Sequence, residues 1–276
     1  MSKMVPVPTH AIIPERDLGK IPVLETRHLG IEFGGLTAVA DFDMTIGRTE
    51  IAGLIGPNGA GKTTVFNLIT KVYQPTHGTI LLNGHDTFGM NTMQVNREGI
   101  ARTFQNIRLF QRLSVEDNVK VGLHNQTQYS VASGILRLPS YWRKERQAHE
   151  RAMELLSLFD MQDLANVTAG ALPYGAQRRL EIVRALATNP SLLLLDEPAA
   201  GMNPSETAEL MENIRKIRDT FGIAIMLIEH DMSLVMGICE GIVVLNYGRI
   251  IAKGTPQQIQ NDPVVIEAYL GKKKEV

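Results

Sequence analysis

Residues 56–63 of the 276-residue chain read Gly56-Pro57-Asn58-Gly59-Ala60-Gly61-Lys62-Thr63, and this stretch decides the fold. It matches the pattern G-x-x-x-x-G-K-S/T and stands between an apolar run at Ile51–Ile55 and a helical pattern at Thr63–Tyr73. The glycines let backbone N–H groups turn around a β-phosphate, and the helix N-terminus adds positive potential. We therefore expect Gly56–Thr64 to bind phosphates, Lys62 to neutralise the β and γ oxygens, and the Thr63 hydroxyl to bind Mg²⁺.

Two adjacent acidic residues follow a second buried run. Leu192–Leu195 is a short, unbroken apolar stretch, which is typical of a strand buried on both faces of a parallel sheet. Such a strand brings Asp196 to its carboxyl end, where the carboxylate helps to hold Mg²⁺, and the adjacent Glu197 can polarise an attacking water. A phosphate loop alone suits a kinase, a GTPase or an ATPase, but the sequence has no Asn-Lys-x-Asp motif for reading guanine. The acidic pair therefore indicates an ATPase.

A histidine and a glutamine complete the candidate site. His230 follows the apolar run Ile223–Ile228, so we expect it at the same edge of the sheet as Lys62 and Glu197, in contact with a γ-phosphate. Taken alone, a histidine of this kind is more often structural, and only its place after a buried strand favours the functional interpretation. Gln105 by itself reads as a surface amide.

Composition excludes several classes of function. The 28 basic and 29 acidic residues nearly balance, so no broad basic surface for nucleic acid is expected. One cysteine excludes an internal disulfide, and the histidines lack the spacing of a structural zinc site. No apolar run approaches the roughly 20 residues that cross a bilayer, so we expect any membrane role to be peripheral.

The strand pattern predicts an α/β fold with more than one layer. An antiparallel layer is expected from three strands, Leu24–Ile31, Phe42–Ile46 and Thr79–Leu82. Hairpin turns are predicted at Asn83-Gly84 and Tyr247-Gly248. The buried runs and the helical pattern Ser205–Thr220 between them form a βαβ unit of a mixed sheet, and amphipathic segments such as Lys144–Met161 predict a helical subdomain at about 106–168.

In their order along the chain these motifs resemble the ATPase subunit of ABC transporters. They are the phosphate loop, Gln105, the helix start Leu172-Pro173-Tyr174-Gly175-Ala176, Asp196-Glu197 and His230. The match covers about residues 24–270. It implies a P-loop NTPase fold of the ABC ATPase type, with a RecA-like mixed sheet, an antiparallel β layer and a helical subdomain. It also implies an extension at 1–20, the ATPase domain at 21–270 and a tail at 271–276.

The resemblance assigns roles that the residues alone do not. It implies that ATP and Mg²⁺ bind, that Phe33 stacks on the adenine without reading a base edge, and that Gln105 senses the metal and the membrane partner. The implied catalytic residues are Lys62, Gln105, Glu197 and His230. The implied metal ligands are Thr63, Gln105 and Asp196. The implied nucleotide-binding residues are Phe33 and Gly56–Thr64.

Two positions depart from the pattern of this family. The family reads Leu-Ser-Gly-Gly-Gln where this chain has Leu172-Pro173-Tyr174-Gly175-Ala176, so a serine hydroxyl is missing, and Asn203 stands where an aspartate is usual. In the family, two ATPase subunits sandwich two nucleotides, and each signature stretch caps the ATP of the other subunit. Two interpretations stay open. Either the site capped by this chain is weakened, or the helix N-terminus alone is sufficient.

Within the family, the details are closest to the ATPase subunits of branched-chain amino-acid importers. They are Phe33-Gly34-Gly35-Leu36, Gln177-Arg178-Arg179-Leu180-Glu181-Ile182, Ala199–Pro204, Glu229–Met232 and Gly254-Thr255-Pro256. This implies transmembrane permease subunits, a second and homologous ATPase subunit, and indirectly a periplasmic binding protein, at the cytoplasmic face of the inner membrane. We expect the two ATPase subunits to form a heterodimer, and a homodimer stays open as the alternative.

Alternatives remain for the substrate and for the protein class. Importers of urea or amides share the pattern. A soluble ABC ATPase acting on DNA or ribosomes is disfavoured because the chain has a single compact cassette, and a non-hydrolysing regulatory subunit is disfavoured because Lys62, Glu197 and His230 are all present. The apolar residues in His124–Arg143 indicate either a contact with the membrane subunits or structural packing.

Overall fold

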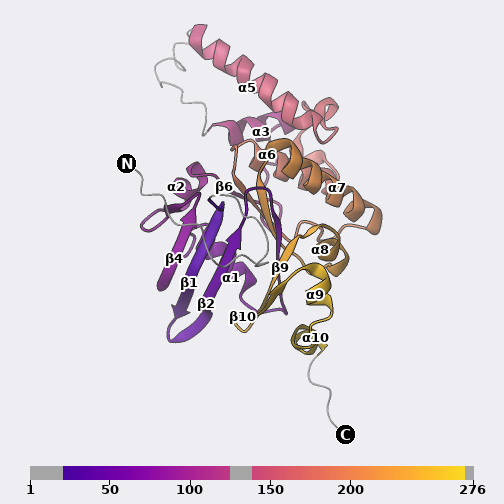
Figure 1. The fold of residues 1–276 in the computed structure, drawn as a ribbon. Coiled ribbons are helices and arrows are strands. Elements are labelled where there is room, and N and C mark those ends of the chain that lie inside the picture. The colour runs from indigo at the N-terminus through magenta and orange to yellow at the C-terminus, as the bar shows by residue number, and fades with distance from the viewer. Residues whose placement is uncertain (1–20, 125–138, 271–276) are drawn as a thin grey trace. The chain divides into compact units, whose positions relative to one another are not determined.

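A computed structural model describes residues 21–124 and 139–270 of the chain. The described residues form two compact units (Figure 1), one built from the chain up to Arg102 and from Ser191 onward, the other from Thr103–Pro190. The expected extension at 1–20, the tail at 271–276 and most of the segment His124–Arg143 lie outside the described residues.

The first unit contains a six-stranded mixed sheet. Its strand order is β10-β9-β3-β8-β7-β6, in which β10 is antiparallel to β9 and the other neighbours are parallel. The strands are β3 (Ile51–Ile55), β6 (Ile100–Arg102), β7 (Leu192–Asp196), β8 (Ala224–Ile228), β9 (Gly241–Asn246) and β10 (Arg249–Gly254). Every residue of β3, β7 and β8 is buried, which is why their sequences are apolar apart from Asp196 at the end of β7.

A second, antiparallel sheet in the same unit has the order β2-β1-β4-β5. Its strands are β1 (Leu24–Phe33), β2 (Leu36–Ile46), β4 (His77–Leu82) and β5 (His85–Asp86). The turn Gly34-Gly35 has φ angles of 54° and 85°, and Asn83-Gly84 has 50° and 82°. These left-handed pairs match the twist of the flanking strands, so they close tight hairpins.

The two sheets share one apolar core with helix α1 (Lys62–Ile69) between them. Val65 and Phe66 of α1, Phe42 of β2, and Ala52 and Leu54 of β3 belong to the same buried cluster. The other face of β3 lies under helix α8 (Met232–Ile238) and the residue after it, because a Cβ on Gly53 would come within 3.0 Å of the Cys239 Sγ.

Helices complete the first unit. They are α2 (Thr92–Arg97), α7 (Pro204–Phe221), α8, α9 (Pro256–Gln260) and α10 (Pro263–Leu270). In Figure 1, α8, α9 and α10 follow one another beside β9 and β10 in orange and yellow. No helix among the described residues is long and apolar enough to cross a membrane.

The second unit is helical. It consists of α3 (Val115–Leu123), α5 (Pro139–Ser157), α6 (Tyr174–Leu186) and two 3₁₀ turns, η1 (Gln162–Leu164) and η2 (Ala169–Ala171). Helix α3 packs on both α5 and α6. It approaches α6 closely at Gly122, where a Cβ would lie 2.4 Å from the Arg184 carbonyl oxygen. The unit therefore extends past the expected 106–168 region, because α6 packs into it.

The expected fold class is confirmed, and the differences are local. Helix α1 ends at Ile69 rather than Tyr73, because Lys71 takes a left-handed φ of 56°. Helix α5 begins at Pro139 and ends at Ser157 rather than spanning Lys144–Met161. Strand β6 and the helices α2, α3 and α8 were not predicted.

A titratable cluster on the antiparallel sheet gives a pH prediction. The exposed His28 of β1 places its Nδ1 2.6 Å from Asp41 Oδ1 and 3.8 Å from Asp43 Oδ2, both on β2. The hydrogen bond with Asp41 and the charges of Asp43 and Asp41 raise the pKa of His28 above its usual value. Because the folded state has the higher pKa, this group's stabilisation is complete below about pH 6.5 and is lost as pH rises through the folded pKa.

We expect Asp41→Asn to lower the pKa of His28 more than Asp43→Asn does, because Asp41 combines its charge with a hydrogen bond to the imidazole, whereas Asp43 hydrogen-bonds only the backbone N–H of His28. An NMR titration of the His28 imidazole in the three chains measures this. A wild-type value at or below about 6.5 would contradict the prediction.

Candidate functional site

The ends of three neighbouring strands position the candidate residues of the first unit. Strands β3, β8 and β7 are adjacent and parallel, so their carboxyl ends reach the same edge of the sheet. The phosphate loop follows β3, Asp196 ends β7 and Glu197 follows it, and Glu229-His230 follows β8. Sheet topology thus gathers at one edge side chains that lie far apart in the sequence.

Lys62 is held inside the phosphate loop. Its Nζ donates hydrogen bonds to the carbonyl oxygens of Gly56 at 2.7 Å and Pro57 at 3.0 Å, and the residue is only 6% exposed. Burial lowers the pKa of Lys62 below its usual value, and the negative charges of Glu197 and Asp196 partly oppose this. The lysine therefore lies within electrostatic range of both carboxylates.

Glycines are required where the loop meets the sheet. A Cβ on Gly56 would lie 2.0 Å from the Leu245 carbonyl oxygen, and one on Gly61, at φ 104°, would lie 2.9 Å from that of Ala38. Gly61 is also the residue that precedes α1, and it makes no side-chain cap. The first backbone N–H groups of α1 therefore receive no hydrogen bond from a side chain at the N-cap position, which suits an anion.

Glu197 and His230 contact each other. The His230 Nε2 and Glu197 Oε1 are 3.0 Å apart, with the histidine side chain 43% and the glutamate side chain 19% exposed. Glu197 has a left-handed φ of 47°, and its backbone N–H donates to the Ile228 carbonyl oxygen at 2.9 Å. A non-glycine residue in this conformation costs about 1–3 kcal/mol and persists only where its surroundings fix it.

Asp196 is paired with a residue that the sequence analysis missed. The Arg102 Nη2 donates to Asp196 Oδ2 at 2.7 Å, and both side chains are less than 10% exposed. The Arg102 Nη1 also donates to Asn67 Oδ1 at 2.7 Å, and its guanidinium lies over the Phe66 ring. Arg102 ends the unpredicted strand β6, so its role becomes visible only from the pairing of β6 with β7.

Glu229 joins two of the loops at this edge. Its buried carboxylate accepts hydrogen bonds from the Ala199 N–H at 2.7 Å and from the His230 N–H at 2.9 Å. The Asp231 N–H donates to the same carboxylate at 3.3 Å. One side chain therefore fixes the backbone after β7 and the backbone that carries His230.

Phe33 is a surface residue. It ends β1, is 45% exposed and meets Tyr73 edge to face, with ring centroids 5.2 Å apart. Exposure leaves part of the ring able to stack on a planar ligand.

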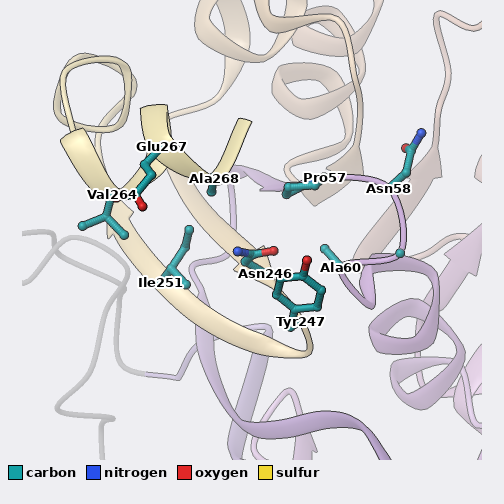
Figure 2. A pocket seen from close by; sticks show the side chains of 10 residues that line it. Pro57, Asn58, Ala60, Asn246, Tyr247, Ile251, Val264, Glu267 and Ala268 are labelled. Atoms are coloured by element: carbon teal, nitrogen blue, oxygen red, sulfur yellow. The ribbon is translucent and has the colours of Figure 1, made fainter. Parts of the chain in front are cut away.

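A pocket of about 510 Å³ lies between the phosphate loop and helix α10 (Figure 2). The loop residues Pro57 to Ala60 line one side, Val264, Glu267 and Ala268 of α10 line the other, and Asn246, Tyr247 and Ile251 lie between. Lys62, Glu197 and His230 do not line it. We therefore place the candidate chemistry at the open sheet edge and not in this pocket.

The remaining candidates are Gln105 and the signature stretch in the second unit, and Asn203 in the first. Gln105 is exposed in an irregular segment, and α6 begins at Tyr174 directly after Pro173. Asn203 caps α7, because its Oδ1 accepts hydrogen bonds from the N–H groups of Ser205 and Glu206 at 3.0 Å each. Asparagine and aspartate cap helices comparably, so this departure from the family pattern keeps the local structure.

The residues present fit Mg²⁺ and a nucleotide phosphate. Hard divalent cations prefer oxygen ligands, and Asp196 and Thr63 offer a carboxylate and a hydroxyl at the end of β7 and the start of α1. The N-terminus of α1 and the Lys62 ammonium offer positive charge to phosphate oxygens.

Comparison with known families gives two matches. A family model described as "ABC transporter" matches residues 39–200, which is more than half of the chain. A second model, described as "Branched-chain amino acid ATP-binding cassette transporter", matches residues 249–275 and so covers β10, α9 and α10.

Curated relatives match over nearly their whole length. The chain is 49% identical to the high-affinity branched-chain amino acid transport ATP-binding protein LivG of Escherichia coli K12, over 91% of this chain and 98% of the relative. It is 46% identical to the corresponding protein BraF of Pseudomonas aeruginosa with the same coverage. The lipopolysaccharide export system ATP-binding protein LptB of Escherichia coli K12 is 33% identical over 90% of this chain and 97% of the relative.

Solved structures agree with this grouping. The ADP conformation of MJ1267, an ATP-binding cassette of an ABC transporter, superposes with a TM-score of 0.79 at 27% identity. The match covers 91% of this chain and 100% of that chain.

Arg102→Met should destabilise the first unit, because it removes the guanidinium that pairs with the buried Asp196 carboxylate at 2.7 Å. Breaking a buried pair on one side costs about 3–5 kcal/mol in free energy of unfolding. The matched control is Arg218→Met, which breaks the partly exposed pairs of Arg218 with Glu240 and Asp219 and should cost no more than about 1 kcal/mol for each pair. Urea unfolding of the three chains measures both values, and equal losses would contradict the structural role of Arg102.

Proposed function

The chain belongs to the ATP-binding proteins of the ABC transporter family, and from this premise we propose that it hydrolyses ATP to drive a branched-chain amino-acid importer. The names of two relatives that cover 91% of the chain support this substrate class, as does the matching C-terminal model. We take residues 21–270 as the ATPase domain, with an extension at 1–20 and a tail at 271–276.

The observation that carries the proposal is the contact between the Glu197 carboxylate and the His230 imidazole at one sheet edge, where the charge of Glu197 also acts on Lys62. In this mechanism Lys62 and the N-terminal amides of α1 bind the phosphates, with the loop Gly56–Thr64 around them. Glu197 accepts a proton from the attacking water, and His230 orients the Glu197 carboxylate and contacts the γ-phosphate.

The proposal also includes contacts with Mg²⁺ and with the adenine. Thr63, Gln105 and Asp196 would hold Mg²⁺, which when bound neutralises charge that develops on the phosphate oxygens. Phe33 stacks on the adenine, and its exposure of 45% supports this role. Arg102 and Glu229 act indirectly, since Arg102 orients Asp196 and Glu229 fixes the backbone of His230.

The proposed assembly contains other chains. A second ATPase subunit would supply the signature stretch over this chain's nucleotide, and Pro173–Ala176 would cap the nucleotide of that partner. Permease subunits would anchor the protein peripherally at the cytoplasmic face of the inner membrane, and a periplasmic binding protein would deliver the substrate to them. We propose no contact with nucleic acid, in line with the balanced charge of the chain.

Glu197→Gln should abolish ATP turnover but keep ATP binding. The amide can still hydrogen-bond the water, but it cannot accept the proton, and loss of such a base lowers the rate roughly 10²-fold or more. The measurement is the ATPase rate of the purified complex with its permease subunits, together with ATP affinity by equilibrium binding. Lys62→Ala is the comparison variant, because it should weaken ATP binding itself. Normal hydrolysis by the Glu197→Gln complex would contradict the assignment.

The substrate class needs its own measurement. In cells that carry the whole importer, Glu197→Gln should abolish the uptake of labelled leucine, isoleucine and valine, because transport requires ATP turnover. Uptake of labelled urea and acetamide serves as the alternative. If the variant loses urea or amide uptake and keeps leucine uptake, the chain energises a different importer of the same family.

A further inference from the structure

The second unit contains a fully buried ion pair on α6, the helix that begins within the signature stretch. Arg178 and Glu181 stand three residues apart on α6, with their side chains 0% and 1% exposed. The Arg178 Nη1 and Glu181 Oε2 are 2.9 Å apart. Removing two charges from water is costly, so such a pair is retained only where further hydrogen bonds satisfy it.

Three further hydrogen bonds of this pair go to the segment that carries Gln105. The Arg178 Nη1 donates to the Phe104 carbonyl oxygen at 2.6 Å, and its Nη2 donates to the Gln105 carbonyl oxygen at 2.8 Å. In return, the Arg108 N–H donates to Glu181 Oε1 at 3.2 Å. Two side chains of α6 thus satisfy three backbone groups within Phe104–Arg108.

This segment has no helix or strand of its own between Thr103 and Phe110. Side-chain hydrogen bonds therefore satisfy backbone groups that a helix or sheet would otherwise satisfy. The planar guanidinium can serve two successive carbonyls at once, which the single ammonium of a lysine matches less well. The buried Asn118 of α3 continues the attachment, because its Oδ1 accepts the Phe110 N–H at 2.9 Å and its Nδ2 donates to the Ser114 carbonyl oxygen at 2.9 Å.

We propose that Arg178 and Glu181 are positioning residues that tie the Gln105 segment to the start of α6, so that Gln105 and Tyr174–Ala176 move as one body. Arg178 lies one helical turn, about 6 Å, beyond the exposed Tyr174, so the attachment is next to the first turn of α6. The proposal rests on the proposed function, in which Gln105 contacts Mg²⁺ and the membrane partner while α6 caps the partner's nucleotide. A shift sensed at Gln105 would then reach the signature stretch directly.

The first test measures the attachment itself and needs no transport activity. Arg178→Lys keeps the positive charge but loses the guanidinium that donates to two carbonyl oxygens. The double variant Arg178→Met/Glu181→Leu removes both charges and fills their place with apolar side chains of similar volume. The matched control is Arg151→Met/Glu154→Leu, an exposed pair on α5 with the same three-residue spacing at 2.6 Å. In the full chain, hydrogen exchange of the amides in 103–110 should quicken by about ten- to hundredfold in both Arg178 variants and stay unchanged in the control. Unchanged exchange in a folded Arg178 variant would overturn the proposal.

The second test separates positioning from stability. In the complex with its permease subunits, Arg178→Lys should raise the Mg²⁺ concentration for half-maximal ATPase activity by about tenfold, with ATP affinity unchanged. In a Gln105→Ala background, Arg178→Lys should cause no further change, because Arg178 acts through Gln105. Equal effects in both backgrounds, or a parallel loss of ATP affinity, would show that the pair only stabilises the fold. If the wild-type complex hydrolyses no ATP, the proposed function fails and the exchange measurement still decides the attachment.

Discussion

The parallel pairing of β3, β8 and β7 is the constraint on which the candidate site depends. Parallel strands place their carboxyl ends at one edge, so the loop with Lys62, the residue Glu197 and the residue His230 come together without being near in sequence. The pairing requires strands that are buried on both faces, and the leucine and isoleucine runs supply that. Within β3, β7 and β8, the residues before the carboxyl ends are apolar because they are buried in the core. The polar residues of the candidate site therefore stand at or just after the ends of these strands.

Buried charge at that edge is tolerated because each group has defined partners. Arg102 compensates Asp196, and the Glu229 carboxylate is surrounded by backbone N–H groups. Arg102 thereby holds the Asp196 carboxylate in place, and Glu229 holds the backbone that carries His230. The strained backbone of Glu197 fits the same picture, because its N–H is bonded to the end of β8 while its side chain contacts His230.

The sequence predicted what depends on local pattern. Strand β3 was predicted residue for residue, because an apolar run between a charged residue and a glycine loop has clear limits, and the Asn83-Gly84 turn was predicted because its φ angles suit asparagine and glycine. Strand β6 was missed because three residues show no periodicity and form a strand only beside β7. The roles of Arg102 and Arg178 could not be predicted from local sequence either. The hydrogen-bond partner of Arg102 lies 94 positions away, and those of Arg178 in the Gln105 segment lie 73 to 74 positions away. The functional roles of Phe33 and Gln105 rest on resemblance and stay predictions.

Helix capping offers a physical reason for the unusual signature stretch. Asn91, Ser114, Asn203, Asp231 and Thr255 each accept hydrogen bonds at the start of a helix, and Asp262 does so for α10. Apart from α5, which begins at the border of the described residues, α1 and α6 are the described α-helices whose preceding residue makes no such bond. One of them follows the phosphate loop, and the other follows Pro173. A serine at position 173 could donate to a phosphate, but its oxygen could also accept from the first-turn N–H groups. Proline does neither, so it leaves these groups to an incoming anion, as at α1. This favours the interpretation in which the terminus of α6 caps the partner's nucleotide through its backbone.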